Sequence, residues 1–355
     1  MNASTDDTGH RNGRRRLLVA GGAATAGLLL DAATAGTAAA EQSEEDTVLG
    51  IEGGVTLHRM SMRTPDGVRL AGHLRVPERA AGPSPAIVVS NAMTSVKEQS
   101  VNAGYAQRLA EAGFVTLAFD QRGFGESGGG PRQHEDNEDR LADLHVAVSH
   151  LAGLPAVDAD RIGAMGVSIG GGLAMNLTAA DPRVRAFVAV AAGLLNPARA
   201  RELMPAYDDM LAEQTAMLQR HHRSGELDRI PVVRTEGHEG PVLFDNPIAE
   251  EYYGDPERGG IARWKNQATA MSLRTLLVHD TRTSADTVGP RAGMLIVGGE
   301  DVSTLPEDHQ AVYERLTGPK RIEILPGVTH NELYDRDAAH DATALAAEWF
   351  TTHLA

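Results

Sequence analysis

The amino-acid sequence predicts an α/β fold with a mostly parallel, doubly wound sheet, and two patterns lead to this prediction. Short, continuous apolar runs recur along the chain, as at 86–89 and 294–297. Such runs are typical of strands that are buried on both faces. Stretches with helical spacing separate these runs, and strands that alternate with helices form parallel sheets. With 355 residues, the chain is long enough to bury one large core.

An antiparallel hairpin is expected before the parallel strands. Strand-like residues 55–63 and 68–76 flank the sequence Thr64-Pro65-Asp66-Gly67. This tetrapeptide predicts a turn because proline fixes φ and glycine supplies a positive φ. The remaining strands are expected at 86–89, 114–119, 161–165, 184–191, 294–297 and 322–325, and helices at 101–112, 141–151, 169–180 and around 345–350.

The stretch from about 194 to 290 breaks this alternation of strands and helices. It is rich in arginine, glutamate and helix-forming residues. A structureless loop of that length is uncommon inside a compact domain. We therefore expect a mostly helical insertion that caps the carboxyl edge of the sheet.

The N-terminal segment has the pattern of an export signal. Arg14, Arg15 and Arg16 precede an apolar run over 17–30, and three alanines occupy 38–40. A basic start, a short apolar run and an A-x-A exit are typical of a secretory signal, and the paired arginines indicate the twin-arginine route. We expect a signal at 1–40, a linker at 41–50 and the folded domain at 51–355. The protein would be secreted or held in the periplasm or cell envelope, without stable membrane insertion once the signal is cleaved. The sequence leaves open whether cleavage occurs, and a disordered tail or an uncleaved anchor is the alternative to a cleaved signal.

Composition excludes several classes of function. The formal net charge is −15, which argues against nucleic acid and anionic lipid as partners. The chain has no cysteine, so disulfides, thiolate metal sites and a cysteine nucleophile are excluded. His145 and His150 are five residues apart, which is poor spacing for a metal site, and we expect no bound metal.

The most informative motif is Gly166-Val167-Ser168-Ile169-Gly170, between an expected strand and an expected helix. In that context G-x-S-x-G forms a sharp turn that exposes a serine nucleophile. The turn leaves no space for a side chain two positions before or after the serine, which explains both glycines. Ser168 is therefore the candidate nucleophile. The N–H of Ile169, at the start of the helix, is a candidate oxyanion donor.

A serine nucleophile needs a base that is held by an acid, and on this type of turn the chain order is serine, acid, histidine. Glu300 and Asp301 follow the expected strand 294–297, and His330 follows the expected strand 322–325. We predict His330 as the base and Asp301 as the acid. Glu300 is the alternative acid because the sequence leaves the register of the turn open.

Several blocks of sequence make residues 50–355 resemble the α/β-hydrolase superfamily, in particular the bacterial branch related to dienelactone hydrolases and X-Pro dipeptidyl-peptidase-like esterases. The blocks are 96–99, 119–128, 157–163, 251–254 and 327–335. The resemblance implies the α/β-hydrolase fold and an acyl hydrolase without a cofactor. It also implies a second oxyanion donor, the Met93 N–H, although Asn91-Ala92-Met93 replaces the His-Gly-x of many relatives. Ser168 stands where many close relatives have cysteine. Asp120 and Arg122 are expected to form a buried ion pair that fixes the glycine-rich loop.

Together these features predict an exported serine hydrolase that cleaves a carboxylic ester or related acyl bond of a small molecule through an acyl-enzyme. Two alternatives have the same fold: an acyltransferase that uses the same triad, and a catalytically silent binding protein. The sequence leaves open whether the substrate is an ester, a lactone, a thioester or a small amide, and it leaves the oligomeric state open.

Overall fold

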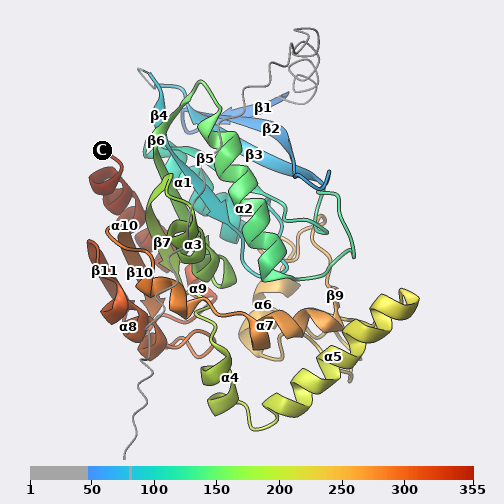
Figure 1. Cartoon of the computed structure of the whole chain (residues 1–355). Helices are drawn as coiled ribbons and strands as arrows, with labels where there is room; N and C mark the ends of the chain where they lie inside the picture. Colours follow the sequence, from blue (N-terminus) through green and yellow to red (C-terminus); the bar gives the residue numbers. More distant parts are fainter. Residues whose placement is uncertain (1–46, 80–81) are drawn as a thin grey trace, which may run out of the picture. The chain divides into compact units, whose positions relative to one another are not determined.

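The computed structural model describes residues 47–79 and 82–355 (Figure 1). The expected signal at 1–40 lies outside the described residues. The main sheet has nine strands in the order β1-β2-β3-β5-β4-β6-β7-β10-β11. The strands are β1 (Thr47–Glu52), β2 (Val55–Arg63), β3 (Arg69–Pro77), β4 (Ser84–Ser90), β5 (Val115–Phe119), β6 (Val157–Val167), β7 (Val184–Val190), β10 (Ala292–Gly298) and β11 (Lys320–Leu325).

The pairing of the strands confirms the predicted fold class. Every pair from β5 to β11 is parallel, whereas β1, β2, β3 and β5 pair antiparallel with one another in that order. The predicted apolar runs form the strands from β5 to β11, among which β5 and β10 are buried along their whole length. Strands β5 and β10 are therefore covered on both faces, as expected from their apolar runs, whereas the edge strand β11 is only partly buried.

Helices cover the two faces of the sheet. Helices α2 (Asn137–Ala152) and α3 (Ile169–Ala180) pack on one face and lie in front of the sheet in Figure 1. Helices α1 (Ser100–Glu111) and α10 (Asp337–His353) pack on the other face, with the short α9 (Glu332–Asp335) against both. Helix α8 (Pro306–Arg315) packs against β10 and β11 at the end of the sheet.

The expected linker at 41–50 is too long at its C-terminal end, because residues 47–50 belong to β1. Gly53 and Gly54 have φ values of 60° and 74° and connect β1 to β2. Two consecutive residues with positive φ form the tight turn that matches the twist of a hairpin. All the residues of β1 are exposed, so this edge strand has no buried face that an alternating apolar pattern could reveal.

The glycine-rich loop is held by different ion pairs from the expected one. Asp120 accepts a hydrogen bond of 2.8 Å from the buried ammonium of Lys97, and Arg122 pairs with Asp143 at 2.7 Å. Asp120 also accepts the backbone N–H of Glu126 within the loop, at 2.8 Å. Asp120 and Arg122 therefore each anchor the loop to a separate element instead of pairing with each other.

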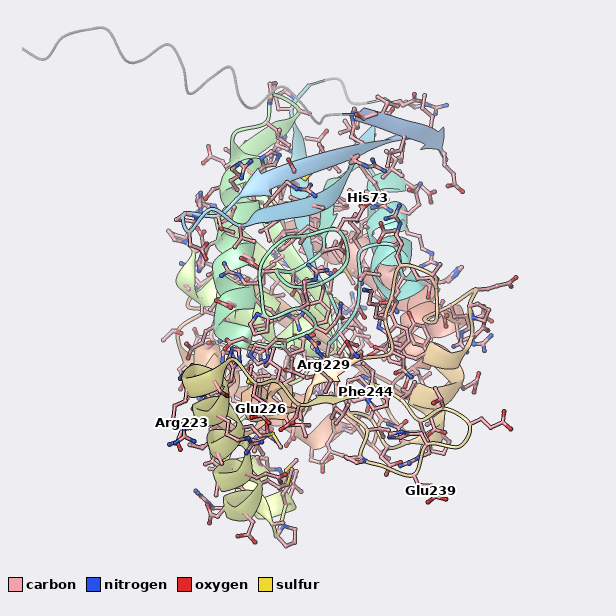
Figure 2. The ribbon with its side chains drawn as sticks, turned by 90° about the vertical axis from the view of Figure 1, so that its right-hand side faces the viewer. His73, Arg223, Glu226, Arg229, Glu239 and Phe244 are labelled. Atoms are coloured by element: carbon pink, nitrogen blue, oxygen red, sulfur yellow. The ribbon has the colours of Figure 1, made fainter. Side chains whose placement is uncertain are left out.

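Between β7 and β10 the chain forms an insertion of short elements. They are α4 (Pro197–Leu203), α5 (Tyr207–Ser224), β8 (Arg229–Ile230), α6 (Pro247–Gly254), β9 (Ala268–Thr269), η1 (Ala270–Ser272), α7 (Leu273–Val278) and η2 (Arg282–Asp286). Figure 2 shows the labelled insertion residues Arg223, Arg229 and Phe244 well away from His73 of β3. Among the described residues, no helix is long and apolar enough to cross a membrane.

Candidate active site

Ser168 occupies the sharp turn between β6 and α3. Its φ and ψ are 55° and −128°, a combination that non-glycine residues rarely adopt. A Cβ atom on Gly166 would overlap the carbonyl group of Gly170, and a Cβ on Gly170 would overlap the carbonyl group of Ser90. Both glycines are therefore required by the close approach of backbone to backbone, as expected from the motif.

The structure brings His330 to Ser168. His330 lies in the loop after β11, and its Nε2 atom is 3.2 Å from the Oγ atom of Ser168. Its Nδ1 atom is 2.7 Å from the Oδ2 atom of Asp301. Because Asp301 faces Nδ1, the network assigns the ring proton of neutral His330 to Nδ1, and Nε2 is left as an acceptor toward Ser168.

Asp301 is buried directly after β10 and is held by several donors. Its Oδ1 atom accepts the backbone N–H groups of Ser303 and Thr304, each at 2.8 Å, and its Oδ2 atom accepts the Thr304 hydroxyl at 2.7 Å. Burial alone would raise the pKa of Asp301. The hydrogen bonds from His330 and Thr304, together with the positive charge that His330 carries when its ring is protonated, outweigh burial and lower the pKa below its usual value. The carboxylate is therefore stabilised in its charged form.

Glu300, the alternative acid, lies elsewhere. Its side chain is exposed, and its backbone N–H donates a 3.0 Å hydrogen bond to the carbonyl oxygen of Val328. The turn after β10 thus directs Asp301, and not Glu300, toward His330.

The two residues that carry the candidate oxyanion donors line the same cavity as Ser168. Ile169 begins α3, and Met93 lies in the loop after β4. Within residues 47–79 and 82–355, neither backbone N–H donates a hydrogen bond to another protein group. Both N–H groups are therefore available to an oxyanion on a substrate that is bound at Ser168.

A buried carboxylate holds the loop that carries Met93. Glu135 accepts the backbone N–H of Thr94, whose φ is 61°, and also the amide of Gln121 at 2.7 Å and the guanidinium of Arg140 at 3.1 Å. Arg140 in turn donates to the carbonyl oxygen of Asn91, at the other end of the loop. These contacts of Glu135 and Arg140, which clamp the loop, could not be predicted from the sequence, because the loop and Glu135 are about forty residues apart and no motif links them.

Tyr334 is a second group at the site that was not predicted from the sequence. Its hydroxyl lies 3.2 Å from the Nε2 atom of His330, and its ring is 5.3 Å from the imidazole, centroid to centroid. The side chain is buried and lines the cavity above Ser168. The spacing of four residues from His330 to Tyr334 was the available signal, although His330 lies in the turn before α9 and the pair is not within one helix.

The cavity above Ser168 has a volume of about 310 Å³ and a largely apolar wall. Its floor contains Ser168, His330 and Met93. Most of the apolar lining comes from the insertion and the segments next to it, namely Leu194, Leu195, Leu203, Met204, Phe244 and Leu276. The size is at the lower end of the range for small-molecule sites, so the cavity fits a small or partly exposed ligand.

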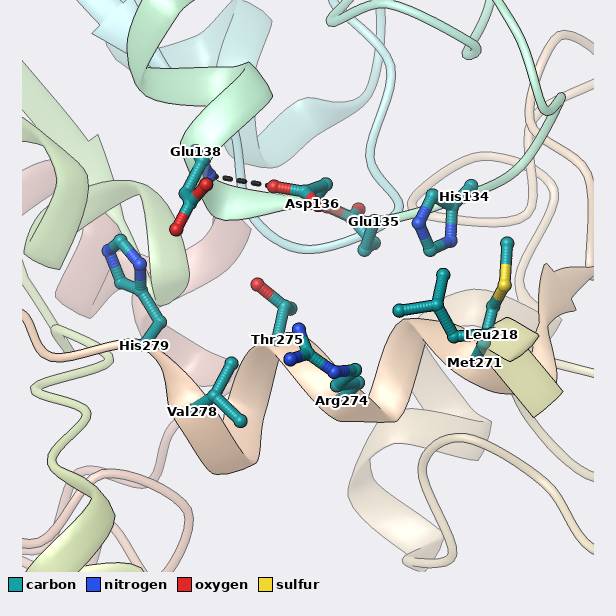
Figure 3. A pocket seen from close by; sticks show the side chains of 10 residues that line it. All are labelled: His134, Glu135, Asp136, Glu138, Leu218, Met271, Arg274, Thr275, Val278 and His279. Atoms are coloured by element: carbon teal, nitrogen blue, oxygen red, sulfur yellow. Dashed lines mark hydrogen bonds between the residues drawn. The ribbon is translucent and has the colours of Figure 1, made fainter. Parts of the chain in front are cut away.

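A second, smaller cavity of about 90 Å³ lies between the start of α2 and helices α5 and α7 (Figure 3). Its polar lining includes His134, Asp136, Glu138, Arg274 and His279. In the part of the chain that the structure describes, no three histidine, aspartate or glutamate side chains are grouped to hold a metal ion.

Comparison with known proteins identifies the family. The family model described as serine aminopeptidase, S33, matches residues 96–337. The uncharacterised protein PA2218 of Pseudomonas aeruginosa is 32% identical over 82% of this chain and 80% of its own length. Its crystal structure superposes with a TM-score of 0.73 at 29% identity, over 88% of this chain and 98% of that chain.

Two fungal relatives have names that state an activity. Polyketide transferase claH of Penicillium crustosum is 28% identical over 77% of this chain and 89% of its own length. Thiohydrolase aneE of Aspergillus aculeatus is 26% identical over 78% of this chain and 87% of its own length. The narrower resemblance to dienelactone hydrolases stays a prediction. The chain belongs to the serine aminopeptidase S33 family of the α/β hydrolases.

Proposed function

We propose that this protein is a serine hydrolase that cleaves an ester or a related acyl bond, with Ser168 as nucleophile, His330 as base and Asp301 as the acid that orients the base. One observation carries the proposal: the imidazole of His330 lies between the two others, 3.2 Å from Ser168 Oγ and 2.7 Å from Asp301 Oδ2. A serine hydroxyl becomes an effective nucleophile in such an arrangement.

The proposed reaction has two stages. In the first, His330 takes the proton of Ser168 while Oγ attacks the acyl carbon, and the N–H groups of Met93 and Ile169 bind the oxyanion. The acyl-enzyme forms when His330 passes the proton to the leaving group. In the second stage, His330 activates a water molecule, which releases the acid. Asp301 stays charged and stabilises the imidazolium in both stages.

The wall of the cavity supports a substrate with an apolar acyl group. The side chains from the insertion that line it are mostly aliphatic, and burial of apolar surface contributes about 25 cal/mol per Å². The fungal relative named a thiohydrolase makes thioesters a substrate class to include with oxygen esters.

The test is the Ser168→Ala variant on a panel of 4-nitrophenyl esters and acyl thioesters. We expect a loss of about 10⁴-fold or more in kcat, because the members of a triad act as a unit. Ser149→Ala, at an exposed position of α2, is the matched control and should keep the wild-type rate. A fluorophosphonate probe should label the wild type and Ser149→Ala but not Ser168→Ala. Unchanged turnover in Ser168→Ala would refute the nucleophile.

A second candidate function is acyl transfer to an alcohol through the same acyl-enzyme. The relative named a polyketide transferase and the apolar wall of the cavity favour it, because an apolar wall limits the access of water. Addition of alcohols during turnover distinguishes the two functions. Transfer predicts that the alcohol ester accumulates at the expense of the free acid, whereas hydrolysis predicts that the yield of acid is unchanged.

We further propose that residues 1–40 export the protein by the twin-arginine route. The proposal is supported by the order of basic start, apolar run and alanine exit in the sequence. Replacement of Arg14 and Arg15 by lysine should retain the protein inside the producing cell, as measured by fractionation. Unchanged export of this variant would contradict the twin-arginine route.

A further inference from the structure

We propose that Tyr334 is a further catalytic residue, whose hydroxyl donates a hydrogen bond to the leaving-group atom while His330 protonates that atom. The inference rests on the proposed nucleophile Ser168. It adds that Tyr334 determines which leaving groups the enzyme can expel. Three features support it: the position of the hydroxyl, its protonation state and the rigidity of the ring.

The first feature is a competition between two hydroxyl groups for one nitrogen. Ser168 Oγ and the Tyr334 hydroxyl both lie 3.2 Å from Nε2 of His330. With its proton on Nδ1, the imidazole offers a single lone pair at Nε2. When Ser168 donates to Nε2, as the attack requires, the Tyr334 hydroxyl must donate elsewhere. In the free enzyme Ser168 Oγ is such an acceptor. Once Oγ is bonded to the acyl carbon, the Tyr334 hydroxyl, which lines the same cavity, can donate to an atom of the substrate.

The second feature is that the Tyr334 hydroxyl keeps its proton. Burial raises the pKa of Tyr334 well above its usual value, and the hydrogen bond with Ser168 reduces the rise only in part. The hydroxyl is therefore a donor at neutral pH and not a proton-transfer group. It stabilises charge on a neighbouring atom without losing its own proton.

The third feature is that the ring is fixed in place. Tyr334 packs edge-on against Tyr252, with centroids 4.9 Å apart and planes at 88°. The backbone next to it is also held, because the Tyr105 hydroxyl donates a 2.8 Å hydrogen bond to the carbonyl oxygen of Leu333. A donor that needs no reorganisation is the kind that stabilises a transition state effectively.

These features assign Tyr334 to the step in which the leaving group departs. The bond from Ser168 Oγ to the acyl carbon forms, and the bond from that carbon to the leaving atom breaks. The serine proton passes through Nε2 of His330 to the leaving atom, which must therefore approach Nε2. The Tyr334 hydroxyl is already a neighbour of Nε2 and can donate to the leaving atom as its charge develops. This help matters most when the leaving atom is strongly basic.

The experiment compares wild type and Tyr334→Phe on three esters of one acid, with 4-nitrophenol, phenol and ethanol as leaving groups. We expect the loss in kcat/KM to be within about threefold for the nitrophenyl ester and to grow to about tenfold to a hundredfold for the ethyl ester. Tyr252→Phe removes a buried hydroxyl from the same aromatic cluster, outside the cavity, and should show no such gradient. Fluorophosphonate labelling of Tyr334→Phe at the wild-type rate would show that Ser168 is intact in this variant.

The outcomes separate this inference from the proposed function. An equal loss for all three esters, or no loss, would overturn the role of Tyr334, because a packing residue does not distinguish leaving groups. The role of Tyr334 fails alone if Ser168→Ala is inactive on all three esters but the Tyr334→Phe losses show no gradient. If Ser168→Ala keeps its turnover, the nucleophile and the role of Tyr334 fail together.

Discussion

His330 Nε2 lies 3.2 Å from Ser168 Oγ although 162 positions separate the two residues in the chain. Strands β6 and β11, which precede these residues, are not neighbours, because β7 and β10 lie between them in the sheet. All four strands are parallel, so the loops that follow them emerge at one edge. Ser168 and His330 therefore meet because the carboxyl ends of the parallel strands all lie at one edge of the sheet. Asp301 lies at the same edge, directly after β10.

The choice of acid is tested by comparing Asp301→Asn with Glu300→Gln. Asp301→Asn should lower kcat by about 10⁴-fold, because the amide does not hold the tautomer or stabilise the imidazolium. Glu300→Gln should keep the rate within about twofold, since exposed substitutions away from the site have small effects. Steady-state kinetics on one activated ester measure both, and a larger loss in Glu300→Gln would identify the other carboxylate as the acid.

We expect that replacing Gly166 or Gly170, the glycines of the turn at Ser168, by any residue with a side chain destabilises the protein. Gly170→Ala places a methyl group against the carbonyl groups of Ser90 and Asn91, and we expect it to lower the free energy of unfolding by about 1–3 kcal/mol or more. Gly254→Ala is the matched control, because nothing lies within 4 Å of its added Cβ. Urea denaturation measures both variants. Equal stability of Gly170→Ala and Gly254→Ala would show that the turn can relax.

The sequence was sufficient for features that depend on local pattern. The buried runs of β4 and β10 and the turn at Thr64–Gly67 follow from apolar continuity and from backbone preference. The motif around Ser168 could be recognised as a nucleophile turn because the sequence predicted both the strand before it and the helix after it. The hairpin from β1 to β2 also had a readable signal in Gly53-Gly54, but the exposed β1 had no apolar alternation to draw attention to it.

The sequence was insufficient to predict which charged and polar side chains pair with each other when they are distant in the chain. The ion pair of Asp120 with Lys97 connects the residue that follows β5 to the loop that follows β4. The hydrogen bond from Thr94 to Glu135 likewise connects the loop after β4 to the segment before α2. Several partners of opposite charge were available to each group, and only the packed structure fixes which of them meet. Tyr334 differs, since its spacing from His330 was visible but an aromatic residue there is equally compatible with core packing.

A buried histidine should make stability depend on pH. His309 is fully buried, accepts the backbone N–H of Ala192 at Nε2 and has its pKa lowered by burial to about 4. The unfolded chain takes up this proton near the usual value of 6.5, so it binds more protons than the folded state between the two values. The free energy of unfolding must therefore fall as pH decreases through that window.

The variant His309→Gln isolates this contribution, because glutamine does not titrate. We expect its free energy of unfolding to fall less steeply than that of the wild type between about pH 6 and about pH 4.5, by up to about 1.4 kcal/mol per pH unit. Urea titrations at several pH values measure the difference in slope. The lowered pKa of His73 contributes to both proteins and cancels in the comparison. Parallel pH profiles would contradict the assignment to His309.

The clamp on the loop that carries Met93 should act on the rate and not on substrate affinity. Glu135→Gln weakens the hydrogen bond that holds Thr94 in its positive-φ conformation, so the neighbouring Met93 N–H is less well aimed at the oxyanion. Because the oxyanion exists only in the transition state and the intermediate, kcat should fall by about tenfold to a hundredfold with little change in KM. Glu138→Gln removes a charge from the same helix start without touching the loop and should keep the wild-type kcat. A rise in KM at constant kcat would mean that the loop binds the substrate and does not stabilise the oxyanion.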